Sequence, residues 1–224
     1  MMPKSPIPCK SHSALHRFKI LAAPANQKTP ALFLDRDGVI IKDVHHISDP
    51  ELVEICPGAF ELIHCANQSR WPVVVVTNQS GISRGLFDWT SFDRVNERMI
   101  SLLGTSASIS AIFANGLPPG SPSQSWRKPS PLMLIEATKY LNIDISQSIM
   151  VGDRLSDLQA GCAASVKYIF HVLSRHGIKE RPSVLSWYNS VDNQSGISPP
   201  ILTCLNSLKT FPLSIISSKD QKSS

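Results

Sequence analysis

The chain has 224 residues, 42% of them hydrophobic, which is typical of one globular domain. No apolar run approaches the roughly 18 residues that a membrane-spanning helix needs, which argues against an integral membrane protein. The net charge of +5 lies in the first 34 residues, which hold five basic residues and no acid, so the formally neutral remainder gives little support for a nucleic-acid-binding surface.

Residues 1–29 are rich in Pro, Ser and Lys, and we expect them to form a disordered basic tail. A targeting role for this segment is the less favoured alternative, because it lacks the uninterrupted apolar core of a secretory signal. A single domain is expected over residues 30–217, followed by a disordered tail at 218–224. The five scattered cysteines form no Cys-x-x-Cys pair, which predicts neither a disulfide framework nor a cysteine zinc site and favours the cytoplasm.

Short apolar segments alternate with helical patterns along the chain. Strands are expected at residues 31–34, 73–76, 109–114, 149–151 and 168–172. Helices are expected at residues 58–70, 90–103, 130–143 and 156–165. The alternation predicts an α/β fold, a doubly wound parallel sheet with helices on both faces. Residues 186–200 are expected to form a loop, and residues 201–211 a last strand or helix.

Polar, glycine-containing segments follow three of the expected strands. DRDG begins at Asp35, TNQSGISRG at Thr77 and GDRLSD at Gly152. Ligands of open parallel sheets bind beyond the carboxyl ends of the strands, so we expect these segments to form one site. The first segment could instead be the Asp-Gly turn of a hairpin. A hairpin turn does not explain why three strands end in the same way, which favours the site.

The motifs DRDGV (35–39), VVVVTNQSGISRG (73–85), RKPSP (127–131) and VGDRLSDLQAG (151–161) resemble, in order and spacing, those of the haloacid dehalogenase (HAD) superfamily of phosphatases. The closest resemblance is to the branch of heptose-bisphosphate and histidinol-phosphate phosphatases, and it extends from residue 31 to residue 182. It implies a HAD-like Rossmannoid fold without a large cap domain. It also implies a phosphoric monoester hydrolase of carbohydrate metabolism that works through an aspartyl-phosphate intermediate.

Hydrolysis of a phosphate ester needs a nucleophile, a proton donor for the leaving oxygen and positive charge for the phosphoryl oxygens. The resemblance implies that Asp35 is the nucleophile. Asp37 projects to the same side and is expected to protonate the leaving alcohol and then deprotonate water. Thr77 and Lys128 are expected to hold the phosphoryl oxygens, Thr77 through its hydroxyl and Lys128 through its charge.

Two carboxylates that face a phosphate dianion require a hard cation, and we expect Mg²⁺. The ligands implied are the side chains of Asp35 and Asp153 and the backbone carbonyl of Asp37. Asp157 either supports the metal or orients Lys128, or is simply an acid at a helix N-terminus. Many members of the branch carry a zinc loop of three cysteines and a histidine, but residues 114–127 contain neither, so no zinc is expected.

The expected substrate is a small sugar bisphosphate such as D-glycero-D-manno-heptose 1,7-bisphosphate. Arg36 and Arg154 are expected in structural ion pairs, whereas Arg84 and Arg127 could bind a second anionic group. The segment KDVHHISDP (42–50) replaces a Gly-Tyr-Val signature of heptose-specific relatives, and its His45-His46 pair is interpreted as a polar loop. Substrate-binding residues are therefore expected to be Asn78, Ser80, Arg84 and Arg127.

Three alternatives remain open. Histidinol phosphate is a second candidate substrate of the same class. A nucleic-acid 3′-phosphatase shares the Thr-Asn-Gln loop and the Arg-Lys-Pro segment, but the balanced charge of the domain argues against a nucleic-acid partner. A catalytically silent binding protein would be expected to lack a motif aspartate or lysine, and all are present. We expect a monomer with neither a nucleic-acid nor a membrane partner.

Overall fold

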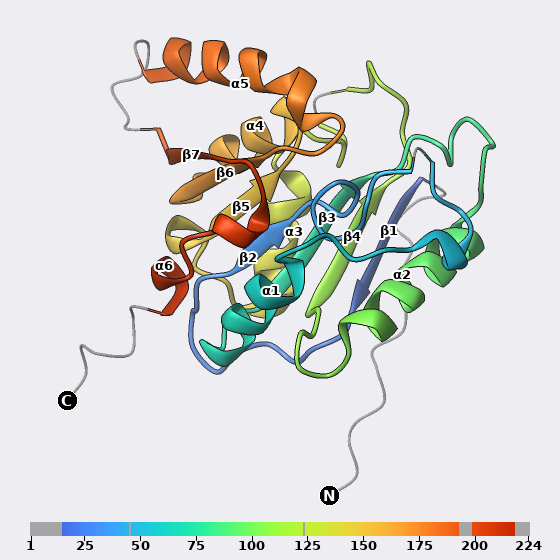
Figure 1. Ribbon diagram of the computed structural model, residues 1–224, viewed down its shortest axis with the longest axis horizontal. Helices are drawn as coiled ribbons and strands as arrows, with labels where there is room; N and C mark the ends of the chain where they lie inside the picture. Colours follow the sequence, from blue (N-terminus) through green and yellow to red (C-terminus); the bar gives the residue numbers. More distant parts are fainter. Residues whose placement is uncertain (1–14, 45, 123, 193–198, 218–224) are drawn as a thin grey trace, which may run out of the picture.

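A computed structural model describes residues 15–44, 46–122, 124–192 and 199–217. Seven strands form one sheet in the order β1-β4-β3-β2-β5-β6-β7, with helices on both faces (Figure 1). β1 runs antiparallel to β4, and the other neighbouring strands are parallel. The predicted doubly wound α/β fold is therefore confirmed, with an antiparallel edge strand added to it.

The five predicted strands all form, with small shifts at their ends, and two further strands lie at the edges of the sheet. Residues 201–211, expected as a strand or a helix, begin as a strand and continue into a 3₁₀ turn. The strands are β1 (His16–Ile20), β2 (Leu32–Leu34), β3 (Val73–Asn78), β4 (Ala111–Asn115), β5 (Ile149–Gly152), β6 (Tyr168–Val172) and β7 (Ile201–Leu205).

The four predicted helices form between the strands, and two more follow β6 and β7. The α-helices are α1 (Ala59–Gln68), α2 (Trp89–Leu103), α3 (Leu132–Leu141), α4 (Leu155–Ala163), α5 (Gly177–Asp192) and α6 (Ser214–Ser217). The 3₁₀ helices are η1 (Pro50–Leu52), η2 (Ile145–Gln147) and η3 (Leu208–Thr210). Within the part of the chain that the structure describes, no helix is long and apolar enough to cross a membrane.

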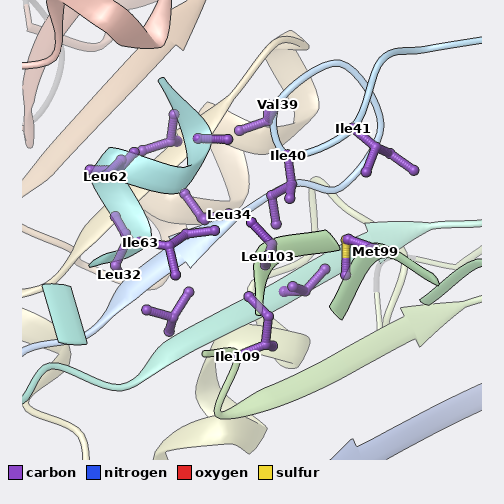
Figure 2. Close-up of a cluster of buried hydrophobic side chains, with 14 of the residues drawn as sticks. Leu32, Leu34, Val39, Ile40, Ile41, Leu62, Ile63, Met99, Leu103 and Ile109 are labelled. Atoms are coloured by element: carbon purple, nitrogen blue, oxygen red, sulfur yellow. The ribbon is translucent and has the colours of Figure 1, made fainter. Parts of the chain in front are cut away.

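Two hydrophobic layers fix the sheet between its helices. Side chains alternate across a strand, so Leu32 and Leu34 of β2 enter the layer beneath α1 and α2, whereas Phe33 enters the layer on the side of α3 and α4. Figure 2 shows Leu32 and Leu34 among side chains from both covering helices, including Ile63 and Met99. Because β2 is buried on both faces, the residue that follows it is held at a defined position.

β1 corrects the prediction of a disordered tail over residues 1–29, of which residues 1–14 lie outside the described chain. Phe18 and Ile20 are buried and alternate with Arg17 and Lys19, which is the period of a strand. On the face that points towards α2, half-buried Arg17 forms an ion pair with Asp93 of that helix. Apolar packing on one face and the charge pair on the other hold this segment against β4.

α5 corrects the prediction of a loop at residues 186–200, because the helix continues to Asp192. Trp187 and Tyr188 are half-buried and pack on the layer of α3 and α4. The Tyr188 hydroxyl also donates a hydrogen bond to the Pro200 carbonyl, at 3.0 Å. Tertiary packing therefore extends a helix whose sequence contains Pro182 and several polar residues.

Phe18→Ala should test whether β1 belongs to the folded core. The Phe18 ring lies 5.5 Å from that of Phe113 and 5.1 Å from that of Tyr140, centroid to centroid. Truncation should lower the free energy of unfolding by about 3 kcal/mol, measured by denaturant titration. Lys19→Ala, on the opposite face of β1, should change it by less than about 0.5 kcal/mol. Equal small effects of the two substitutions would show that β1 is dispensable.

Candidate active site

The three polar segments meet at the carboxyl edge of the sheet, as predicted. Asp35 follows β2, Thr77 lies in β3 and Asp153 follows β5, and β2 is the parallel neighbour of both other strands. The cavity between the loops has a volume of about 290 Å³. It is lined by Asp35, Asp37, Asp43, His46, Ile47, Thr77, Asn78, Gln79, Ser80, Arg84, Pro119, Arg127, Lys128, Arg154, Ser156, Asp157 and His176.

Lys128 is the buried cation at the base of this cavity. Its Nζ lies 2.9 Å from Asp35 Oδ1 and 2.7 Å from Asp157 Oδ1, and donates a hydrogen bond to the Val76 carbonyl at 2.8 Å. Burial alone would lower the pKa of the Lys128 ammonium, but the two carboxylates outweigh burial and raise that pKa above its ordinary value. Lys128 is therefore charged at neutral pH.

The side chain of Asn78 holds the backbone of Lys128. Its Nδ2 donates to the Lys128 carbonyl and its Oδ1 accepts from the Lys128 N–H, both at 3.1 Å. These bonds join β3 to the loop that precedes α3. Asn78 thus supports Lys128, and because it also lines the cavity, its expected part in substrate binding stays a prediction.

Asp35 is oriented by hydrogen bonds to one of its two carboxylate oxygens. Oδ1 accepts from the Arg36 N–H at 2.8 Å and faces the Lys128 ammonium. Burial raises the pKa of the Asp35 carboxyl to about 6, against the lowering effect of Lys128. Because Oδ1 is engaged by Arg36 and Lys128, the other oxygen, Oδ2, is the one that can react with a ligand in the cavity.

Asp153 has the donor chemistry of a metal ligand. Its Oδ2 accepts a hydrogen bond from Ser174 Oγ, whereas Oδ1 is buried and has no hydrogen-bond partner within the described residues. Oxygens of Asp35, Asp153 and Asp157 lie within 4.8 Å of one another. Burial and the negative charges of Asp157 and Asp35 raise the pKa of the Asp153 carboxyl to about 8. Three carboxylates against one ammonium form a site that suits a hard divalent cation.

Asp157 combines two of the roles considered for it from the sequence. Oδ1 contacts Lys128, and Oδ2 accepts the Arg154 N–H at 3.0 Å in a capping box at the start of α4. Gly152 makes room for this carboxylate, since a Cβ there would lie 2.2 Å from that of Asp157. The helix cap thus fixes the carboxylate that holds the lysine.

Asp37 and Thr77 share a donor that was not predicted, the side-chain amide of Gln79. Its Nε2 lies 2.8 Å from both Asp37 Oδ2 and Thr77 Oγ1. Arg36 forms the ion pair expected of it, at 3.1 Å from the same Asp37 carboxylate. Because Thr77 Oγ1 accepts from Gln79, its own hydroxyl proton can be donated to a ligand.

Gly38 lets the chain leave the site after the two motif aspartates. Its φ is +85°, and a Cβ there would lie 2.5 Å from Asp153 Oδ2. The hairpin alternative for this segment is wrong, since β2 pairs in parallel on both sides. The glycine is required by the close approach of the Asp153 carboxylate.

The predicted substrate residues at the rim lie where they can meet a ligand. Ser80 and Arg84 line the cavity, and exposed Arg84 lies 3.4 Å from the His46 ring nitrogen. Arg127 is half-buried, and its Nη1 donates to the Leu117 carbonyl at 2.9 Å. Burial and the nearby charge of Arg154 lower the pKa of the Arg127 guanidinium. Arg154 was expected in an ion pair; among the described residues it forms none within 4.0 Å, and it lines the cavity.

The loop after the first motif supplies rim residues that the sequence did not identify. Asp43 and His46 line the cavity, and Asp43 Oδ2 lies 2.8 Å from His176 Nε2. His45, the other half of the adjacent pair, lies outside the described residues. The sequence did show that this loop differs from the signature of heptose-specific relatives, which suggested a part in specificity. It did not show which residues of the loop would face the cavity.

Comparisons with known proteins show what this chain is similar to. A model of the HAD-hydrolase-like family matches residues 125–187. The D-glycero-beta-D-manno-heptose-1,7-bisphosphate 7-phosphatase of Mesorhizobium japonicum is 44% identical over 144 residues, 61% of this chain and 66% of the relative. The enzyme of the same name from Salmonella typhi is 38% identical over 147 residues, 62% of this chain and 78% of the relative.

Two crystal structures extend the likeness to the fold. A protein from Mesorhizobium loti described as a HAD-like phosphatase superposes with a TM-score of 0.76 at 32% identity, covering 94% of this chain and 97% of its own. D,D-heptose 1,7-bisphosphate phosphatase from B. bronchiseptica, complexed with magnesium and phosphate, gives a TM-score of 0.66 at 27% identity, covering 85% of this chain and 97% of its own.

In the absence of metal, Asp153→Asn should remove the repulsion between the Asp153 carboxylate and those of Asp157 and Asp35. Because the pKa of Asp153 is higher in the folded than in the unfolded protein, the folded state binds its proton more tightly, and stability falls as pH rises towards about 8. In EDTA, the melting temperature of the native sequence should fall between about pH 6 and about pH 8, and that of the variant should fall less.

Added Mg²⁺ should raise the melting temperature of the native sequence at about pH 8 and leave that of Asp153→Asn unchanged. Asp144→Asn, at a carboxylate outside the acidic cluster of Asp35, Asp153 and Asp157, is the matched control and should behave as the native sequence does in both tests. This assignment of Asp153 would be ruled out if the melting temperatures of the native sequence and of Asp153→Asn fell equally with pH. It would also be ruled out if Mg²⁺ raised the two melting temperatures equally.

Proposed function

The chain belongs to the family of HAD-like phosphatases, and we propose that it is a Mg²⁺-dependent phosphomonoesterase acting on a small sugar bisphosphate, with D-glycero-D-manno-heptose 1,7-bisphosphate as the first candidate. The observation that carries this proposal is the buried arrangement of Asp35, Lys128 and Asp157 at the base of a cavity with a cationic rim. The similarity to heptose-bisphosphatases from two bacteria supports the choice of substrate.

The first half of the reaction follows from the geometry of Asp35. Oδ1 is held by Lys128 and by the Arg36 N–H, so Oδ2 attacks phosphorus and forms the aspartyl-phosphate. The bond from phosphorus to the sugar oxygen breaks, and that oxygen leaves with its electron pair. Lys128 and the Thr77 hydroxyl hold the phosphoryl oxygens during this transfer.

Asp37 supplies and removes the proton. Its carboxyl protonates the leaving sugar oxygen, which departs as an alcohol. The resulting carboxylate then takes a proton from water as the water oxygen attacks the aspartyl-phosphate. The bond from phosphorus to Asp35 breaks, which releases inorganic phosphate and restores the Asp35 carboxylate and the Asp37 acid.

Mg²⁺ fits the acidic donor set of this site. The unpartnered Asp153 Oδ1, the Asp35 carboxylate and the Asp37 backbone carbonyl would hold the ion. When bound, it neutralises the charge that builds up between the phosphate and the carboxylates. The B. bronchiseptica relative, which binds magnesium and phosphate in its crystal structure, supports this choice of metal.

Positive charge at the rim supports a second anionic group on the substrate. Arg127 and Arg154 lie close enough for the charge of one to lower the pKa of the other, and both line the cavity together with exposed Arg84. An anion bound near both guanidinium groups would offset the repulsion between them. A bisphosphate would place one phosphate at Asp35 and the other at this rim.

Phosphate release is the direct test of the proposed function. The 224-residue chain should release phosphate from heptose 1,7-bisphosphate in the presence of Mg²⁺ and not in EDTA. Asp35→Asn should lower kcat by at least about 1,000-fold, because the amide is a poor nucleophile. Asp88→Asn is the matched control, since Asp88 caps α2 and Asn is an equally good N-cap.

Histidinol phosphate and a DNA 3′-phosphate complete the substrate panel. Faster turnover of either compound would keep the reaction and replace the substrate proposed here. A folded, Mg²⁺-binding protein that hydrolyses none of the three would contradict the enzymatic proposal.

Arg127→Ala should separate recognition of the second phosphate from chemistry. It should raise KM for heptose 1,7-bisphosphate by about 10-fold, because it removes one charged contact to the distal phosphate. The KM for heptose 7-phosphate, which lacks that group, should change little and serves as the internal control. A similar rise in KM for both sugars would place Arg127 at the reacting phosphate instead.

A further inference from the structure

Arg36 lies between the two motif aspartates and is fully buried. Its Nε and Nη2 donate to the Asp37 carboxylate at 3.1 to 3.2 Å, and its Nη1 donates to Asn96 Oδ1 at 3.1 Å. Its Cζ lies 5.0 Å from the centre of the Phe92 ring. A guanidinium is seldom buried unless it is paired, so these contacts define the role of the residue.

We infer that Arg36 is a positioning residue that holds the Asp37 carboxylate in the orientation needed to protonate the leaving sugar oxygen. This inference rests on the proposed function, since it concerns the proton of that reaction. Like the nucleophile, the acid must be aligned with the reacting atoms, and small displacements of such groups cost large factors in rate.

The hydrogen bonds distinguish the two oxygens of Asp37. Oδ2 accepts from Arg36 Nε, Arg36 Nη2 and Gln79 Nε2, at 3.2, 3.1 and 2.8 Å. Oδ1 accepts from Arg36 Nη2 at 3.2 Å. Three donors occupy the lone pairs of Oδ2, so Oδ1 has the capacity to carry a proton and to deliver it.

α2 provides the anchor for this arrangement. Phe92 and Asn96 are one helical turn apart on the buried face of α2, beside Val95 and Met99. Asn96 is a polar residue in an otherwise apolar stripe, and burial of its amide is offset by the bond to Arg36. The position of the acid is therefore set by a helix that lies outside the lining loops.

A purely structural role for Arg36 predicts a different result from a positioning role. Loss of structure lowers the rate for every substrate by a similar factor. Loss of alignment lowers the rate most where the leaving oxygen needs a proton, and least where it does not. A sugar alkoxide needs the proton, whereas the p-nitrophenolate ion is a stable leaving group.

The experiment compares kcat for heptose 1,7-bisphosphate and for p-nitrophenyl phosphate in the 224-residue chain with Mg²⁺. Arg36→Lys keeps the charge and removes the paired donors, Arg36→Met removes both, and Asn96→Ala removes the anchor. Asp37→Asn, which lacks the acid, gives the largest difference between the two compounds that loss of proton transfer can produce. Met99→Ala is the matched control, since it removes packing from the same helix without touching Asp37.

For Arg36→Lys and Asn96→Ala, kcat for the sugar should fall about 10- to 100-fold, and kcat for p-nitrophenyl phosphate should fall less than about 3-fold. Met99→Ala should show no such difference between the two compounds. Equal losses on both compounds in the Arg36 and Asn96 variants would overturn the inference. Failure of the native sequence to hydrolyse the sugar would instead overturn the proposed function, and the inference with it.

Discussion

The ammonium of Lys128, buried between the carboxylates of Asp35 and Asp157, is the contact on which the arrangement of the site depends. A charge removed from water is tolerated when partners surround it closely, so each partner must be brought to its place by the fold. β2 places Asp35, the turn from β5 into α4 places Asp157, and Asn78 of β3 ties down the Lys128 backbone. The three central strands must therefore be correctly paired before the lysine can be buried.

Charge is distributed unevenly between the base and the rim of the cavity. The base has a surplus of negative charge, because the carboxylates of Asp35, Asp153 and Asp157 cluster there, and the Lys128 ammonium contacts two of them, Asp35 and Asp157. The rim has a surplus of positive charge, with Arg127 and Arg154 close together. A phosphate that approaches the nucleophile thus passes cationic groups and then needs a cation at the base. This separation makes one cavity suitable for a metal ion and for an anion with two charged ends.

Residues at strand ends could be predicted from the sequence, whereas those that act through tertiary contacts could not. The polar segments that begin at Asp35, Thr77 and Gly152 could be located because each follows a strand expected from the sequence, whereas the roles of Asp35 and Asp153 came from the resemblance to the HAD superfamily. Gln79 and Asn96 were missed, since an amide in a turn-forming loop or in a helical stripe has no local feature that reveals its distant partner. β1 was missed because its alternation spans five residues within a basic, proline-rich segment, and the decisive packing comes from β4 and α2.

The place of β1 also has a consequence for how the chain folds during synthesis. β1 is made first, yet its partner β4 begins at Ala111, and the strands from β2 onward pair with neighbours that do not need it. Contacts between segments so far apart in sequence form late, because the entropy cost of closing a long loop must be met before the contacts can stabilise the chain. A growing chain therefore carries Phe18 and Ile20 without their packing partners until the middle of the protein has left the ribosome, and during that interval the first strand is open to association with other chains.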